Sequence, residues 1–438
     1  MNAPYHGKIT HRRVLGIAIP IVVSNATIPL LGAVDTAVVG QLGAAAPIGA
    51  VGIGSIIITT VYWLFGFLRM GISGMASQAR GRSDSAELSA LFCRSLIFGF
   101  IVGLFLVAMK EPLAWAAFLL SPASPEVESM AAEYTSIRFF SAPAAISIYG
   151  ITGWLIAQER TRSVLYLQVW TNGINIALDF LFVLELDRGV AGVAEATLIA
   201  EWSGFALGVW ICRGALANGA WRKFSLIFDM VKIRRMVSIN VDIMIRTAIL
   251  EAAFLSFLFF GAGFGDVTLA ANQVLLQFLH ITAYALDGFA FAAEALVGLA
   301  VGARTRSCLR RSVVLTCIWS VFLVLAFSAA FAIAGPSIID LMATSPAVRI
   351  ESRQYYLWIV AAPIAGVAAW MLDGVFVGAT RTRDMRNAMI LSFLIYCASL
   401  WAFLDPLENH GLWLSLTILN LARGIALGIR YIELERTV

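Results

Sequence analysis

The chain has 438 residues, of which 60% are hydrophobic and only 13% are charged. A soluble domain carries about 25% charged residues, so a polar surface this sparse cannot solvate a protein of this size. The composition excludes an ordinary soluble enzyme, and the missing solvent-facing residues must face lipid. The net charge of +4 does not indicate a nucleic-acid binder, because the basic residues fall in short loops between apolar runs.

The first apolar stretch runs from Val14 to about Val39 behind the basic residues Lys8, Arg12 and Arg13. It is too long for the apolar region of a signal peptide, and no small-residue cleavage pattern closes it. We therefore expect it to be retained as the first membrane span.

Neither a metal motif nor a catalytic motif is present in the sequence. The five cysteines are scattered without CxxC spacing, which predicts free thiols and neither a disulfide framework nor a zinc site. They are Cys93, Cys212, Cys308, Cys317 and Cys397. Since HExxH and GxSxG are also missing, an intramembrane enzyme is not favoured, and no cofactor is expected beyond a coupling ion.

Apolar stretches long enough to cross about 30 Å of hydrocarbon recur along the whole chain. They predict an all-α polytopic membrane protein with twelve transmembrane helices. The predicted spans are 14–42, 46–74, 87–109, 129–157, 163–185, 190–212, 236–261, 267–301, 312–334, 350–378, 387–404 and 410–430. Because twelve is even, both termini lie on the same side of the membrane.

The distribution of basic residues indicates which side this is, because Lys and Arg concentrate in cytoplasmic loops. One set of span ends holds Lys8, Arg12, Arg13, Arg80, Arg82, Arg94, Arg160, Arg162, Arg213, Arg222, Lys223, Lys232, Arg234, Arg235, Arg304, Arg306, Arg310, Arg311, Arg381, Arg383, Arg386, Arg430 and Arg436. The opposite set holds only Lys110, Arg188, Arg349 and Arg353. The asymmetry predicts an inner-membrane protein with both termini in the cytoplasm.

The two halves of the chain resemble each other at a nearly constant shift in residue number. The shift places Arg13 on Arg235, Gly43 on Gly265, Gly81 on Gly302 and Arg162 on Arg383, and Pro143 matches Pro363. This predicts two pseudo-symmetric six-helix bundles of the same orientation. The expected domains are an N-terminal lobe at 1–212, a linker at 213–235 and a C-terminal lobe at 236–438. Trp221, Phe224, Ile227 and Phe228 among basic residues predict a linker at the cytoplasmic interface.

Ionisable residues inside membrane spans are costly and usually functional. They are Asp35, Arg69, Arg138, Asp179, Glu195, Glu201, Arg246, Glu251, Asp287, Glu294, Asp373 and Arg423. Asn175 and Asp179 are four apart and share a helix face, while Asp35 and Thr197 lie on two other spans. These four could coordinate Na⁺ with oxygen ligands or hold one shared proton. Helix bridging by Asp35 and Asp179 is the simpler alternative.

In the second half, Arg246, Glu251, Asp287 and Asp373 are candidates for a cavity cluster, as a structural network or as a second proton site. For Glu195, Glu201 and Glu294 a packing role is favoured. Pro20 and Pro29 precede Asp35 and can bend the first span, either as a static kink or between two states.

Five segments carry a resemblance to a known family. VDTAVVGQLGAAAPIGAVGIG, FGFLRMGISGMASQARG, NIALDFLFVL with GVAGVAEATLIAEW, YALDGFAFAAEALVG and LDGVFVGATRTRDMRNAM resemble the multidrug and toxic compound extrusion (MATE) family, in the branch of DNA-damage-inducible protein F (DinF). The resemblance implies a V-shaped cavity between two lobes and export by alternating access, driven by inward H⁺ or Na⁺. It also implies that Asp35, Asn175, Asp179 and Thr197 form the N-lobe cation site.

We therefore expect a secondary transporter, a monomer surrounded by lipid, that exports amphipathic and mainly cationic compounds. Eight carboxylates against four arginines within the spans favour cations. An organic-anion exporter or a lipid-linked flippase on the same architecture is the alternative. By the same resemblance, the charges of Glu195 and Glu201 depart from the family pattern.

Overall fold

The computed structural model describes residues 8–41, 44–119, 124–217 and 219–438, and the regular structure in these residues is helical. The long helices are α1 (His11–Gly40), α4 (Ser85–Ala108), α8 (Thr161–Asp179), α9 (Gly189–Ile211), α12 (Met230–Ala262), α13 (Asp266–Gly302), α14 (Arg306–Met342), α15 (Pro346–Gly378) and α16 (Thr382–Thr437). Two further long segments are composite: α2 (Ala45–Trp63) continues through η1 (Leu64–Gly66) into α3 (Phe67–Gly81), and α6 (Pro125–Arg138) continues through η2 (Phe139–Ser141) into α7 (Ala142–Ala157).

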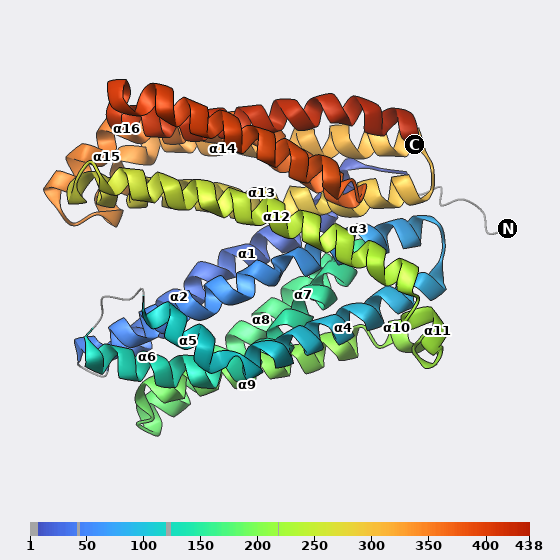
Figure 1. Ribbon diagram of the computed structural model, residues 1–438, viewed down its shortest axis with the longest axis horizontal. Helices are drawn as coiled ribbons and strands as arrows, with labels where there is room; N and C mark the ends of the chain where they lie inside the picture. Colours follow the sequence, from blue (N-terminus) through green and yellow to red (C-terminus); the bar gives the residue numbers. More distant parts are fainter. Residues whose placement is uncertain (1–7, 42–43, 120–123, 218) are drawn as a thin grey trace. The chain divides into compact units, whose positions relative to one another are not determined.

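Short helices complete the chain. They are α5 (Lys110–Phe118), the π-helical end of α8 called η3 (Phe180–Glu185), α10 (Gly214–Ala217), η4 (Ala220–Arg222) and α11 (Phe224–Ile227). Figure 1 shows α13, α14, α15 and α16 running along one common direction. Across the described residues, ten helical segments are long and apolar enough to cross a membrane.

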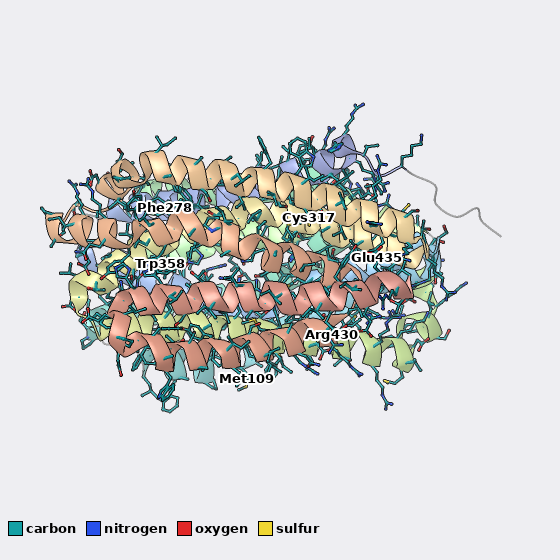
Figure 2. The ribbon with its side chains drawn as sticks, turned by 90° about the horizontal axis from the view of Figure 1, so that it is seen from above. Met109, Phe278, Cys317, Trp358, Arg430 and Glu435 are labelled. Atoms are coloured by element: carbon teal, nitrogen blue, oxygen red, sulfur yellow. The ribbon has the colours of Figure 1, made fainter. Side chains whose placement is uncertain are left out.

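Helix α16 is two helices joined at a sharp corner. Its 56 residues would extend about 84 Å as one straight helix, far more than a bilayer needs. Glu408 has a non-helical backbone at φ 49° and ψ −128°, and the two ends of α16 meet where Arg381 Nη2 donates to Thr437 Oγ1 at 3.0 Å. The two arms lie side by side in Figure 2. With α1 and these two arms, the structure has the twelve long helices that the hydropathy pattern predicted.

The predicted duplication has a counterpart in the backbone. Six residues other than glycine have a positive φ in the described parts of the chain, and they form three pairs. The pairs are Ser83 with Arg304, Glu159 with Thr380, and Asp187 with Glu408. The offset in residue number is the same in all three pairs, and it matches the shift seen in the sequence. Residues other than glycine rarely adopt this backbone conformation. Its occurrence at three matching pairs of positions shows that the same tight corners recur in both halves. Gly43, one of the residues aligned by sequence, lies outside the described residues.

The chain divides into two compact units. The first comprises residues 8–22, 80–83 and 235–438, and the second comprises residues 23–79 and 84–234 of the described chain. Helix α1 therefore contributes to both units. The first unit has a core of α12 to α16 side chains, including Phe257, Phe278 and Trp413. The core of the second unit includes Val39, Tyr134 and Val193, from α1, α6 and α9.

Helices α4 and α7 of the second unit pack with their backbones close together. A Cβ added at Gly103 would lie 2.2 Å from Cα of Pro143, and one at Gly99 would lie 2.8 Å from Cα of Ser147. Small residues allow helices to approach this closely in membranes, where packing replaces the hydrophobic effect as the main attraction.

The ends of a few helices in the structure differ from the ends of the predicted spans. Helix α12 begins at Met230, ahead of the predicted start of its span at 236, and α14 extends from Arg306 to Met342, beyond both predicted ends. Helix α5 was not predicted. Each of these extensions carries charged or polar residues that lower the local hydropathy without interrupting the helix.

Candidate functional site

Helix α8 presents a buried polar face in the second unit. Asn172, Asn175 and Asp179 follow each other at spacings of three and four residues, so they share one face of the helix, and all three are buried. Asn172 Nδ2 donates to Thr27 Oγ1 of α1 at 3.0 Å. This polar face therefore joins α8 directly to α1, the helix that carries Asp35.

The two carboxyl groups of the predicted site meet. The side chains of Asp35 of α1 and Asp179 of α8 are close enough to interact directly, and the amide nitrogen of Asn175 lies within 3.3 Å of both. Asp179 is fully buried, and its Oδ1 atom has no hydrogen-bond partner. Two carboxylates this close repel each other when both are charged, so the pair favours uptake of one proton or one cation.

The amide of Asn175 lies between this pair and Thr197 of α9. Because charged carboxylates only accept hydrogen bonds, the amide nitrogen is assigned to face them, 3.3 Å from Asp35 Oδ1 and 3.2 Å from Asp179 Oδ2. The amide oxygen then accepts from Thr197 Oγ1 at 3.0 Å. The structure thus brings together all four residues predicted for the site.

The donor set suits a hard cation. Carboxylate, amide and hydroxyl oxygens are the ligands that hard cations such as Na⁺ prefer, and the unpaired Asp179 Oδ1 offers a free lone pair. Within the described residues no cluster of three or more His, Cys, Asp or Glu side chains suits a metal ion. The site instead relies on two carboxylates assisted by neutral oxygens.

An arginine next to the pair is already neutralised. Arg138 of α6 is close enough to act electrostatically on both Asp35 and Asp179. Its guanidinium makes a two-pronged ion pair with Glu201 of α9, at 2.9 Å and 3.0 Å. Nη1 of Arg138 also donates to Ser141 at 2.9 Å. This geometry leaves the carboxyl pair free to bind an ion rather than the arginine.

The second glutamate of α9 is also paired. Glu195 lies 2.8 Å from Nη1 of Arg188, whose side chain is half exposed. The charges of Glu195 and Glu201 therefore each have an arginine partner. Both fit the packing role that the sequence favoured for them.

The first unit contains a buried cluster with an excess of positive charge. Asp373 of α15 accepts from Arg246 of α12, and Nη2 of Arg423 in α16 lies 3.3 Å from the same Oδ2 atom. All three side chains are at most 10% exposed. Arg246 and Asp373 are two of the residues that the sequence predicts for this cluster, whereas Arg423 is an additional member.

The other candidates of this unit are less tightly held. Glu251 lies near enough to Arg246 to feel its charge, and Asp287 acts on Tyr284 one turn away on α13. Both are half-buried, whereas Glu294 is buried. Helix α1 continues through Pro20 and Pro29 without a break in its helical assignment.

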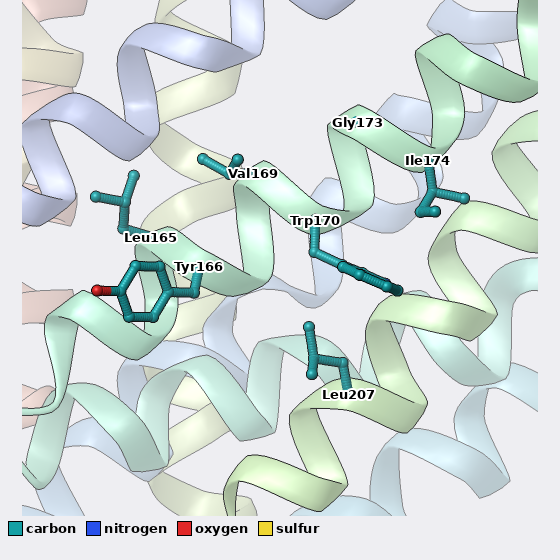
Figure 3. A pocket seen from close by; sticks show the side chains of 7 residues that line it. All are labelled: Leu165, Tyr166, Val169, Trp170, Gly173, Ile174 and Leu207. Atoms are coloured by element: carbon teal, nitrogen blue, oxygen red, sulfur yellow. The ribbon is translucent and has the colours of Figure 1, made fainter.

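An open pocket of about 560 Å³ lies on the other side of α8 (Figure 3). Tyr166, Val169, Trp170 and Gly173 of α8 line it together with Leu207 of α9. At about 100° per residue most of these positions face away from Asn175 and Asp179. The same helix therefore presents the polar side chains of Asn175 and Asp179 on one face and an aromatic, apolar surface on the other.

Comparisons with known proteins give the family. The MatE family model matches residues 20–181 and 243–400. DNA damage-inducible protein F of Escherichia coli K12 is 35% identical over 94% of this chain and 90% of its own length. A probable multidrug resistance protein NorM of Rhizobium meliloti is 25% identical over 98% of this chain and 95% of its own.

Solved structures show the same fold. A MATE protein in a bent conformation superposes with a TM-score of 0.85 at 19% identity, covering 97% of this chain and 96% of that one. A Vibrio cholerae MATE transporter gives a TM-score of 0.84 at 20% identity, covering 98% and 97%. This chain therefore belongs to the MATE family of efflux transporters, in the branch of DNA damage-inducible protein F.

Proposed function

We propose that this protein exports amphipathic, mainly cationic organic compounds in exchange for inward H⁺ or Na⁺ by alternating access. The observation that carries the proposal is the contact between Asp35 and Asp179, two carboxyl groups on different helices with one orphaned oxygen. Loading and unloading this pair changes the charge in a buried place, which is what coupling to an ion gradient requires.

The loaded ion would act on helix α1. Asp35 belongs to α1 and Asp179 to α8, so an ion or proton shared between them holds the two helices together. Emptying the site leaves two charges that repel. Since Pro20 and Pro29 each remove a backbone hydrogen bond from α1, this helix is suited to bend when that attachment is lost.

Substrate polarity is argued from the charges within the spans. Glu195 and Glu201 are matched by arginines, whereas Asp35 and Asp179 lie against each other and add negative charge to the interior. Aromatic surfaces such as the pocket of Tyr166 and Trp170 can stack on flat rings and cations. Together these features favour lipophilic cations.

A second candidate function rests on a specific observation. Arg246 and Arg423 exceed Asp373 by one positive charge, and guanidinium groups bind carboxylates and phosphates well. That cluster favours an organic-anion exporter or a lipid-linked flippase. Comparing efflux of a cationic dye with that of an anionic dye of similar size separates the two functions.

The experiment uses purified protein in vesicles with H⁺ and Na⁺ gradients imposed separately. Asp35→Asn and Asp179→Asn are each expected to abolish gradient-driven efflux, because an amide keeps the volume but cannot alternate between a charged and an uncharged form. Asp266→Asn, an exposed carboxylate at the start of α13, is the matched control and should transport normally. Normal efflux by either site variant at equal protein density would refute the coupling role.

We further propose that the protein acts as a monomer in the inner membrane with both termini in the cytoplasm. The concentration of basic residues at one set of helix ends supports this orientation.

A further inference from the structure

The segment that joins the two halves carries an exposed aromatic face. Here "the linker" means residues 213–217 and 219–231, which contain α10, η4, α11 and the first residues of α12. Trp221, Phe224, Phe228 and Val231 follow each other at spacings of three, four and three residues. They are 46%, 72%, 53% and 79% exposed. Phe224 and Phe228 stack with their ring planes 9° apart, so these two rings form one apolar surface, and we call them, with the exposed Trp221 and Val231, the aromatic face of the linker.

The opposite side of the linker is fixed to helix α4. Arg94 of α4, which is buried, donates from Nε to the carbonyl of Ile227 at 2.8 Å and from Nη2 to the carbonyl of Leu226 at 2.6 Å. Ile227 itself is buried, which corrects its expected place on the interfacial face. Carbonyl groups at the end of a helix lack helical partners, so Arg94 satisfies them and holds the linker in place.

An ion-pair chain secures both ends of this attachment. The third nitrogen of Arg94, Nη1, donates to Glu87 at 2.8 Å, and Glu87 accepts from Lys232 Nζ at 2.6 Å. Arg94 thus connects α4 to α11, while Lys232 connects α4 to α12. The aromatic face is therefore held in one orientation, turned away from the helices to which the linker is attached.

The linker also carries basic residues, and two of them lie over aromatic rings, one in the linker and one at the end of α9. Arg222 lies over the ring of Trp221 at 4.9 Å, Arg213 lies over the ring of Trp210 at 4.5 Å, and Lys223 is exposed. Aromatic rings set at headgroup depth beside Lys and Arg are typical of segments that lie in a membrane interface. Exposed cations at this depth attract anionic lipids.

We propose that the linker is a binding site for anionic phospholipid. The rings of Trp221, Phe224 and Phe228 enter the boundary between headgroups and acyl chains. Arg213, Arg222 and Lys223 contact the headgroup phosphates. The linker begins directly after α9 and ends in α12, two predicted membrane helices, so it lies at the level of the lipid surface. This proposal is independent of the transported substrate and of the coupling ion.

The experiment measures which of two phospholipids lies next to the linker. Phe228→Cys, in a chain whose natural cysteines are replaced by serine or alanine, is labelled with a fluorophore and reconstituted in mixed phosphatidylglycerol and phosphatidylcholine vesicles. Bromine, which quenches the label, is placed on the chains of one lipid or the other at equal total composition. Ile333→Cys on α14, 84% exposed, is the control position.

Brominated phosphatidylglycerol should quench the label at position 228 at least about two-fold more than brominated phosphatidylcholine, because each exposed cation favours the anionic lipid. The two lipids should quench equally at position 333. Arg222→Gln with Lys223→Gln, both exposed and expected to fold, should remove the difference at position 228.

Three results would overturn the proposal. Equal quenching at position 228 would show that the linker lies in lipid without selecting its charge. Absence of quenching by either lipid would place the aromatic face in water or under a protein. Loss of the difference on adding inorganic phosphate would identify a site for free phosphate instead of a lipid headgroup.

Discussion

The two glutamates of α9 allow a sharp test of how burial sets the strength of an ion pair. Glu201→Gln leaves the charge of Arg138 without its counter-charge, and the two side chains are only 17% and 8% exposed. Removing one partner of a buried pair costs about 3–5 kcal/mol. The glutamine carbonyl can still accept one hydrogen bond, worth about 1 kcal/mol. We therefore expect Glu201→Gln to lower the free energy of unfolding by about 2–4 kcal/mol.

Glu195→Gln is the matched control, since it makes the same change on the same helix. Its partner Arg188 is 50% exposed, and water screens such a pair, so the expected loss is below about 1 kcal/mol. Unfolding is measured by titrating purified protein with sodium dodecyl sulfate in mixed micelles. Replacing both Arg138 and Glu201 with leucine should recover most of the stability lost in Glu201→Gln, because no unpaired charge then remains.

Unfolding of Glu201→Gln and Glu195→Gln at the same detergent fraction would refute the effect of burial on these ion pairs. A double leucine variant less stable than Glu201→Gln would also refute it, because the penalty would then come from packing and not from the uncompensated arginine.

The packing of α4, the second buried cluster and the topology each give a further prediction. Gly103→Ala should sharply lower the thermal stability or yield of folded protein, because its Cβ would meet the backbone of Pro143; Gly52→Ala, with nothing within 4 Å, should leave both unchanged. Asp373→Asn leaves two buried guanidinium groups without a counter-charge. It should lower the free energy of unfolding by about 3–5 kcal/mol in the same detergent titration. A loss smaller than that of Glu195→Gln would contradict a buried ion-pair cluster at Asp373. A reporter fused after Val438 should be active only in its cytoplasmic form and one inserted near Glu408 only in its periplasmic form; the reverse result would refute the orientation.

Much of this architecture can be predicted from the sequence, because a membrane span leaves a local record in hydropathy. The apolar runs located the long helices, including the two arms that meet at Glu408. The spacing of Asn175 and Asp179 placed them on one helix face. Their grouping with Asp35 and Thr197 was a hypothesis from ligand chemistry that the family resemblance supported, since nothing local in the sequence relates three separate spans.

The ion pairs could not be predicted in the same way. Arg138 and Glu201 lie on α6 and α9, far apart in the sequence, and Arg423 of α16 meets Asp373 of α15 from a different helix. In a hydropathy profile each of these charged residues only lowers the local value. The profile contains no information about which charged side chains contact each other. The count of eight carboxylates against four arginines therefore includes several charges that are not free, because they neutralise each other in ion pairs.

The constant shift between the two halves identifies the residues of the second half that match Asp35, Asn175 and Asp179 of the first. Applied to Asp35, Asn175 and Asp179, the shift that relates the positive-φ corners leads to Ser256, Tyr396 and Leu400. Ser256 Oγ and the Tyr396 hydroxyl are hydrogen-bonded at 2.9 Å, so the matching helices of the second half are also in contact there, through neutral side chains. The second half therefore has no carboxylate pair at this place, and we expect a single coupling site per chain, in the first half.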